Sequence, residues 1–137
     1  MARSKSGLFL MELIIAICFF AVASAIFVQL FAHAFTLSQR SKGIQMAVMN
    51  AQSVAEGFRG LEGDIDTLAS FWRASASDGG FVAWFDDDWA NVAHNSRFRM
   101  AVEVDLLTVP ATIDINVTDT MFDTELYSTR LRRYLGR

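Results

Sequence analysis

The stretch that decides the fold is GLFLMELIIAICFFAVASAIFVQLFA, residues 7–32. Its twenty residues from Leu13 to Ala32 include only two polar ones, Ser24 and Gln29. An α-helix rises about 1.5 Å per residue, so roughly 20 apolar residues cross the hydrocarbon core of a bilayer. The stretch therefore predicts a membrane-spanning helix.

The residues before this stretch are basic. Arg3 and Lys5 precede it without an acidic residue, and basic flanks favour the cytoplasmic side of a membrane. We therefore expect residues 1–7 in the cytoplasm and the C-terminal part of the chain outside. The apolar run is longer than the roughly 7–15 residues of a secretory signal, and its outer end lacks a small-residue cleavage site, so we expect it to be retained.

A plain membrane anchor does not explain Glu12. A carboxylate within an apolar membrane segment costs on the order of 2–3 kcal/mol. One interpretation places Glu12 among the cytoplasmic headgroups, where this cost is smaller. The other is that Glu12 meets a positively charged partner only when several copies assemble.

The N-terminal sequence KSGLFLMELIIAICFF, residues 5–20, resembles the class III signal of type IV pilins and pseudopilins. In that family a glycine precedes the cleaved bond, and a glutamate is the fifth residue of the processed chain. Gly7 and Glu12 match these two positions, and the resemblance covers residues 3–40.

The resemblance implies that a prepilin peptidase cuts between Gly7 and Leu8 and methylates the new amine of Leu8. It also implies that the carboxylate of Glu12 pairs with the Leu8 amine of a neighbouring subunit in a filament. Phe9 and Leu10 differ from the frequent Thr-Leu pair of the family, and the helix lacks the proline of many major pilins. These departures favour a minor pilin or a pseudopilin.

Beyond the membrane segment, apolar residues keep a helical spacing. They recur at three- and four-residue intervals, at Ile44, Ala47, Val48, Ala51, Val54, Ala55 and Phe58. This pattern predicts an amphipathic extension whose apolar stripe packs on a sheet. Gly57 and Gly60 mark its end, so the whole helix is expected from about Leu8 to Arg59.

The remaining residues predict a head with a short helix at Glu62–Ala74, ended by the SASDGG segment, and an antiparallel sheet of about four strands. The expected strands are Phe81–Phe85, Arg97–Asp105, the alternating segment Ile113–Val117, and Glu125–Leu135, with a turn at Val109–Ala111. Short connections put these strands in meander order.

The predicted fold class is therefore α+β, with a long N-terminal helix packed on an antiparallel meander sheet. Four segments are expected: a cytoplasmic leader (1–7), a transmembrane and assembly helix (8–35), an amphipathic extension (36–60) and an extracytoplasmic head (61–137).

Asp86, Asp87 and Asp88 form an acidic cluster, and carboxylate oxygens are ligands that calcium prefers. Adjacent side chains diverge, and the alternating ligand spacing of a calcium loop is missing, so we favour a solvated turn over a metal site. No set of acid, base and nucleophile is visible in the head, so we expect neither an enzyme nor a cofactor.

The charge balance does not indicate direct binding to nucleic acid. From Thr36 onward, ten Arg or Lys residues stand against fourteen Asp or Glu residues, a net charge of -4. No basic stripe is present that could follow a phosphate backbone.

Two functions compete. The first is a structural subunit of a type IV pilus-like, type II secretion or competence filament, with membrane lipid around it before assembly. Its partners are prepilin peptidase, other pilins or pseudopilins and the inner-membrane assembly platform. The second is a permanently anchored single-pass protein with an extracellular binding or sensor domain. Both place the chain in the cytoplasmic membrane, and the first later moves it into a surface or envelope-spanning filament.

Overall fold

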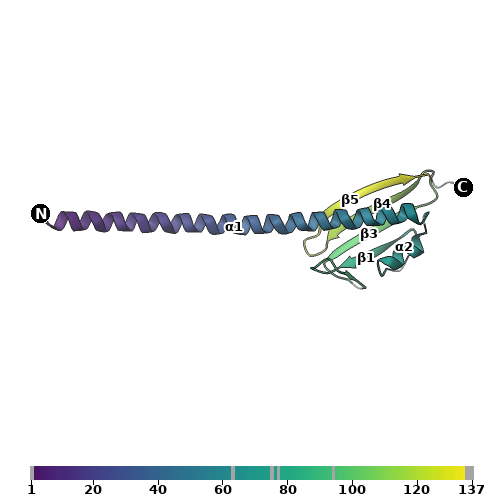
Figure 1. The fold of residues 1–137 in the computed structure, drawn as a ribbon, viewed down its shortest axis with the longest axis horizontal. Helices are drawn as coiled ribbons and strands as arrows, with labels where there is room; N and C mark the ends of the chain where they lie inside the picture. The colour runs from purple at the N-terminus through teal and green to yellow at the C-terminus, as the bar shows by residue number, and fades with distance from the viewer. Residues whose placement is uncertain (1, 63, 75, 77, 94, 135–137) are drawn as a thin grey trace. The chain divides into compact units, whose positions relative to one another are not determined.

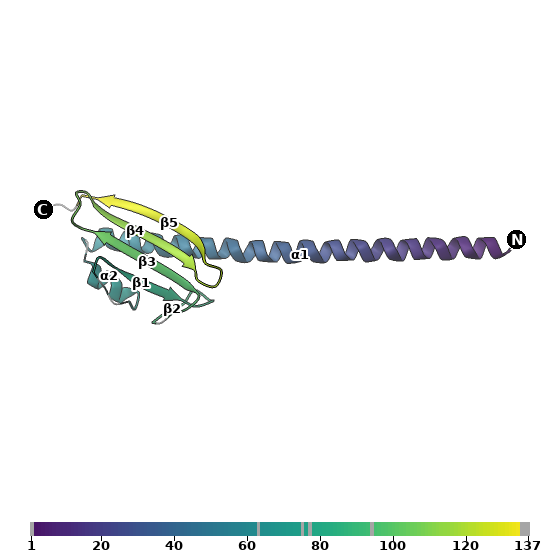
Figure 2. The same ribbon diagram turned by 180° about the vertical axis from the view of Figure 1, so that it is seen from behind.

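The computed structural model describes residues 2–62, 64–74, 76, 78–93 and 95–134. Its elements are α1 (Ala2–Gly60), α2 (Ile65–Phe71), β1 (Gly80–Phe85), β2 (Asn91–Val92), β3 (Phe98–Asp105), β4 (Ala111–Asp119) and β5 (Thr124–Arg133) (Figure 1; β2 is labelled in Figure 2). The chain divides into two compact units, Met1–Ser41 and Lys42–Arg137, and α1 contributes residues to both.

The first unit consists of the apolar part of α1. Its large hydrophobic side chains from Leu8 to Leu37 are all exposed, from 46% at Leu13 to 80% at Phe31. Among the described residues, α1 is the one helix long and apolar enough to cross a membrane. The prediction of a helix capable of spanning a bilayer is confirmed, whereas its orientation in a membrane stays a prediction.

Two hydroxyl groups in this unit, those of Ser24 and Thr36, are satisfied within the helix itself. Ser24 Oγ donates to the carbonyl of Phe20 at 2.8 Å, and Thr36 Oγ1 donates to the carbonyl of Ala32 at 3.0 Å. Such bonds to the preceding turn remove the need for a water or protein partner. These two polar side chains are therefore compatible with an apolar environment.

α1 begins earlier than the sequence suggested, at Ala2 rather than at Leu8. Alanine, arginine and lysine are strong helix formers, and neither a proline nor a capping motif stops the helix near Gly7. The C-terminal end agrees closely with the prediction, since α1 ends at Gly60 and the amide of Leu61 donates to the carbonyl of Gly57 at 2.9 Å.

In the second unit, the last part of α1 lies on one face of a five-stranded antiparallel sheet (Figure 2). The strand order is β2-β1-β3-β4-β5, which confirms the α+β class and the meander of the four long strands. The sheet has one strand more than the four predicted, and this additional strand is β2. It pairs with the outer edge of β1 through only two residue pairs, Trp84–Val92 and Phe85–Asn91, and is too short to show a period of two.

The alternation predicted for β3 is confirmed. Phe98, Met100, Val102 and Val104 are buried, and the intervening Arg99, Glu103 and Asp105 are exposed. β4 continues the buried layer with Ala111, Ile113, Ile115 and Val117. These two central strands therefore supply much of the sheet's contribution to the core.

The apolar stripe of α1 is shifted slightly from the predicted set. Ala47, Ala51, Val54, Ala55 and Phe58 are buried, as expected. Ile44, however, is 38% exposed and Val48 is half-buried.

Gly43 takes the position that the four-residue spacing from Ala47 assigns to this stripe. It is buried, and a Cβ atom there would lie 3.9 Å from Leu126 Cδ1 of β5. Ile44 therefore lies beside the helix–sheet contact rather than within it.

α2 is shorter than the predicted Glu62–Ala74 segment because Asp64 caps it. The Asp64 carboxylate accepts hydrogen bonds from the Thr67 hydroxyl at 2.6 Å and from the Thr67 amide at 3.2 Å. The hydroxyl first, and then the amide, stabilises the charged carboxylate and lowers the pKa of Asp64 below its usual value. At the other end, Arg73 has a positive φ of 50°, and the helix stops before it.

The last strand also differs in its bounds. β5 runs from Thr124 to Arg133 instead of from Glu125 to Leu135, and Leu135 lies outside the described residues. The expected turn at Val109–Ala111 lies slightly earlier, because Ala111 already belongs to β4. The Asp105 carboxylate organises this connection by accepting the amides of Leu107 and Thr108 at 2.9 and 3.3 Å.

Candidate functional site

The residues predicted for processing and assembly, Gly7, Leu8 and Glu12, all lie in the first unit on α1. Leu8 is 68% exposed, Glu12 is exposed, and a Cβ atom at Gly7 would meet nothing within 4 Å. Residues four apart on a helix are neighbours on one face. The structure therefore places Leu8 and Glu12 on the same exposed face, one turn apart.

Glu12 is a carboxylate on an apolar helix surface. Its neighbours Met11 and Leu13 are 65% and 46% exposed, and Ile15 is 65% exposed. None of the ion pairs among the described residues includes Glu12. In an apolar environment, a cation or hydrogen-bond donors stabilise such a carboxylate.

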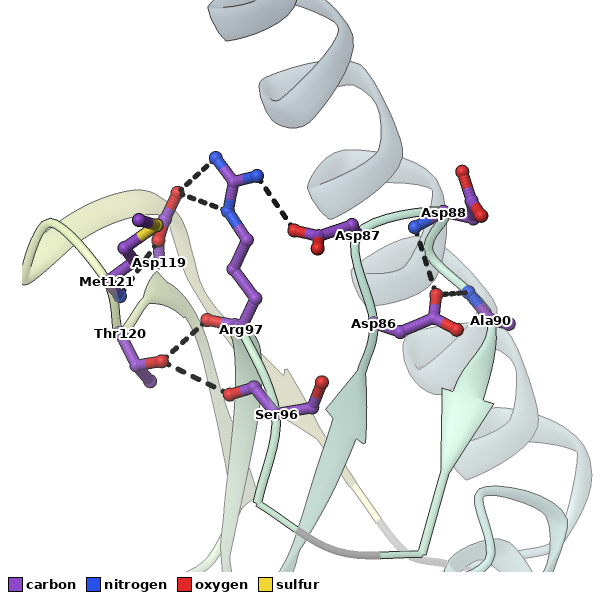
Figure 3. Close-up of polar contacts among 9 residues, drawn as sticks. All are labelled: Asp86, Asp87, Asp88, Ala90, Ser96, Arg97, Asp119, Thr120 and Met121. Atoms are coloured by element: carbon purple, nitrogen blue, oxygen red, sulfur yellow. Dashed lines mark hydrogen bonds and ion pairs between the residues drawn. The ribbon is translucent and has the colours of Figure 1, made fainter.

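The carboxylates of Asp86, Asp87 and Asp88 lie in the loop between β1 and β2, and each has a different environment (Figure 3). Asp86 Oδ1 accepts the amides of Asp88 and Ala90 at 3.0 and 2.9 Å, which closes the loop on itself. Asp87 Oδ1 accepts from Arg97 Nη1 at 2.9 Å, and Asp88 is exposed. Within the described ranges, no group of three or more His, Cys, Asp or Glu side chains could hold a metal ion.

Arg97 connects this loop to the end of β4. Its Nε and Nη2 atoms both lie 3.4 Å from Asp119 Oδ2, and the Asp119 residue is only 6% exposed. Asp119 Oδ1 also accepts the amide of Met121 at 3.0 Å. The hydrogen bond to Asp87, and then the charge of Asp119, raise the pKa of Arg97 above its usual value. Arg97 therefore fastens two loops that are far apart in the sequence.

The sequence did not reveal this cluster. Arg97 stood at the start of an alternating strand, where its position indicated an ordinary outward-facing residue. Its partners Asp87 and Asp119 are ten and 22 residues away. A period-2 pattern carries no information on which loops meet at the end of a sheet.

Aromatic packing holds the same loop from the core side. Trp89 is 8% exposed and stacks on Phe98 with ring centroids 4.0 Å apart, although its φ of 62° is unusual for a bulky residue. Phe85 contacts Trp89 at 5.8 Å and Trp72 at 5.7 Å. Trp89 is therefore a core residue, whereas Trp84 is half-buried.

An apolar groove of about 550 Å³ lies between the end of α1 and α2 in the second unit. Its lining residues are Ser53, Gly57, Gly60, Leu61, Leu68, Phe71 and Trp72. Gly57 leaves room for α2, since a Cβ atom there would lie 2.6 Å from Leu68 Cδ1. Phe71 at the groove is 77% exposed. The sequence predicted the two helices but not the groove between them.

No family model, curated protein or solved structure matches this chain.

Proposed function

We propose that this chain is a minor pilin or pseudopilin, a non-enzymatic subunit of a type IV pilus-like, type II secretion or competence filament. The observation that carries the proposal is Glu12, a single carboxylate on an exposed apolar helix, five residues after Gly7. This spacing is the one that the pilin signal requires. A simple anchor has no need of it.

The fold supports the proposal only in its general architecture, a long apolar helix joined to an antiparallel sheet. A long helix has an apolar first part that the described residues leave uncovered, and its last part packs on an antiparallel sheet. This arrangement is compatible with a pilin-like fold. The extent of the exposed apolar surface also calls for lipid or protein around it.

In the proposed sequence of events, lipid first covers the transmembrane segment, with the basic leader in the cytoplasm. A prepilin peptidase removes residues 1–7 and methylates the amine of Leu8. The platform then extracts the chain, and the apolar helices of neighbouring subunits replace the lipid.

Glu12 has a defined role in this assembly. The cationic amine of Leu8 on one subunit meets the Glu12 carboxylate of its neighbour within the bundle of apolar helices. Each charge alone would be costly there, so the register that pairs them is the least unfavourable one. The carboxylate therefore acts as a register-setting group rather than as an anchor.

A second candidate function is a permanently anchored protein whose head binds a ligand. The observation that favours it is the groove of about 550 Å³ between α1 and α2, which has the size and apolar lining of a small-molecule site. In that case the N-terminus stays unprocessed and Glu12 has no assembly role.

Intact-mass analysis of the protein purified from its native membranes tests the proposal. The expected species consists of residues 8–137 with one added methyl group, and fragmentation places that methyl on the amine of Leu8. A chain that keeps Met1–Gly7 contradicts the filament function and favours the anchored alternative.

A further inference from the structure

The bond that the proposed peptidase cuts lies inside a regular helix. α1 begins at Ala2, so the Gly7–Leu8 peptide group is helical. In an α-helix the amide of Leu8 donates to the carbonyl of Ser4, and the carbonyl of Gly7 accepts the amide of Met11. Both polar atoms of this peptide group are therefore engaged within the helix.

Hydrolysis is difficult in this conformation. The reaction adds water to the carbonyl carbon of Gly7, breaks its C–N bond to Leu8, and leaves a carboxylate on Gly7 and an ammonium on Leu8. In the helix, the neighbouring turns crowd that carbonyl carbon, and its oxygen already holds a donor. The helix must open around Gly7 before water and the groups of the peptidase can reach the bond.

On the leader side of the bond, the neighbouring residues are exposed. Lys5, Ser6 and Gly7 are exposed, and the space around a Cβ atom at Gly7 is empty within 4 Å. Alanine, arginine and lysine favour the helix in residues 2–5, but Ser6 and Gly7, directly before the bond, are weaker helix formers, and the ends of helices open readily.

On the other side of the bond, the apolar run begins at Leu8. Inside a bilayer its backbone polar groups find hydrogen-bond partners only within the helix, so this part resists opening. Gly7 is therefore the boundary between a part of α1 that opens easily and a part that does not.

We propose that the leader opens from a helical to an extended conformation before cleavage, and that the helix stability of residues 2–7 controls the cleavage rate. This inference rests on the proposed function and adds a conformational requirement to it. Cleavage is slowed by anything that strengthens the first turns of α1, and it is accelerated by anything that weakens them.

The test compares Ser6→Gly with Ser6→Ala in the full chain, reconstituted in vesicles with a prepilin peptidase. Both variants remove the hydroxyl and keep a small uncharged residue. They differ in the equilibrium constant between helical and non-helical conformations at this position, which is roughly fivefold higher for alanine than for glycine. We expect kcat/KM to follow the order Gly, Ser, Ala, with up to that fivefold difference between the extremes. Hydrogen exchange at the Leu8 amide is expected to follow the same order.

Ser41 provides the matched control, because it is an exposed serine on the same helix, far from the bond. Ser41→Gly and Ser41→Ala are expected to be cleaved at equal rates. Equal rates for the two Ser6 variants, or a loss in both, overturn the inference, since a loss in both indicates recognition of the hydroxyl. No cleavage of the unsubstituted chain overturns the proposed function instead.

Discussion

Glu12 and Arg97 are both charged groups next to apolar side chains, but their surroundings differ. Arg97 lies between Asp87 and Asp119, and its guanidinium carbon is 4.9 Å from the centre of the Phe98 ring. Glu12 has no ion-pair partner in the part of the chain that the structure describes. Arg97 therefore contributes to the folded monomer, whereas the role proposed for Glu12 requires a second subunit.

Replacing Glu12 by Val tests that role. The substitution removes a charge from the apolar helix, so membrane insertion is expected to be unchanged or improved. Incorporation into filaments is expected to fall below detection, measured as the fraction of the chain in sheared filaments relative to membranes. Glu56→Val, at an exposed position later on α1, is the control and retains incorporation. Normal incorporation of the Glu12 variant would contradict the pairing.

Replacing Arg97 by Ala tests the loop cluster. The variant removes the Arg97 guanidinium from Oδ2 of the buried Asp119 carboxylate, while Oδ1 keeps the amide of Met121. A buried oxygen left unsatisfied costs about 1–3 kcal/mol. The free energy of unfolding of the full chain in detergent micelles, measured by urea denaturation, is expected to fall by this amount.

Arg130→Ala is the matched control for that measurement. It breaks an ion pair with Asp114 whose side chains are 64% and 40% exposed, and exposed pairs contribute about 0–1 kcal/mol. Equal losses in the Arg97 and Arg130 variants would show that burial of Asp119 has no energetic consequence.

At the scale of elements, helix–helix contact in the second unit depends on one glycine. A methyl group at Gly57 would lie 2.6 Å from Leu68 Cδ1, so α2 or the Leu68 side chain must move. The clashing atom is the end of a side chain, so Leu68 can relieve part of the overpacking, and the higher helix propensity of alanine offsets about 1 kcal/mol more. Gly57→Ala is therefore expected to lower the free energy of unfolding by about 1 kcal/mol, the low end of the usual range for overpacking.

Gly60→Ala is the natural comparison for Gly57→Ala. Gly60 also lines the groove, but a Cβ atom there would meet nothing within 4 Å. We expect this variant to unfold at nearly the same temperature as the unsubstituted chain. If the two variants behave alike in calorimetry, close packing at Gly57 is not important for stability.

Elements with a clear period could be predicted from the sequence, and those set by contacts between distant residues could not. The alternation from Phe98 to Val104 identifies β3 because one face of the sheet is buried. The start of α2, by contrast, depends on the Asp64 cap, and β2 depends on its pairing with β1. The start of α1 at Ala2 follows from local helix propensity, whereas the spacing of Gly7 and Glu12 carries no information on where the helix begins.

The candidate sites likewise divide into those that the sequence could predict and those that it could not. Gly7, Leu8 and Glu12 could be singled out from the sequence because they are defined by their spacing along one helix. The structure places Leu8 and Glu12 one turn apart on an exposed face, and the processing and assembly roles of the three residues stay predictions. The Arg97 cluster and the groove at Gly57 join segments distant in sequence. Such juxtapositions appear only when the sheet and α2 are in place.

At the scale of the whole molecule, the orientation across the membrane is the main open prediction. Cys18 is the sole cysteine and can be replaced by Ala, so single cysteines can be introduced elsewhere. In intact cells carrying Cys18→Ala, a membrane-impermeant maleimide is expected to label the Ser41→Cys variant.

The Ser6→Cys variant in the same background is expected to react only after the membrane is made permeable. Labelling is scored in a strain without prepilin peptidase, so that residues 1–7 are retained. The reverse pattern would place the leader outside and would contradict both the filament function and the anchored alternative.

The distribution of tryptophan has a practical consequence. Trp72, Trp84 and Trp89 are the three tryptophans of the chain, and all belong to the second unit. Trp72 and Trp89 pack against Phe85 and Phe98 in its core. Intrinsic fluorescence therefore reports on the sheet and α2 but not on the apolar helix. A shift of the emission maximum to longer wavelength would reveal unfolding of the head even while the helix remains in a micelle, so detergents can be selected optically.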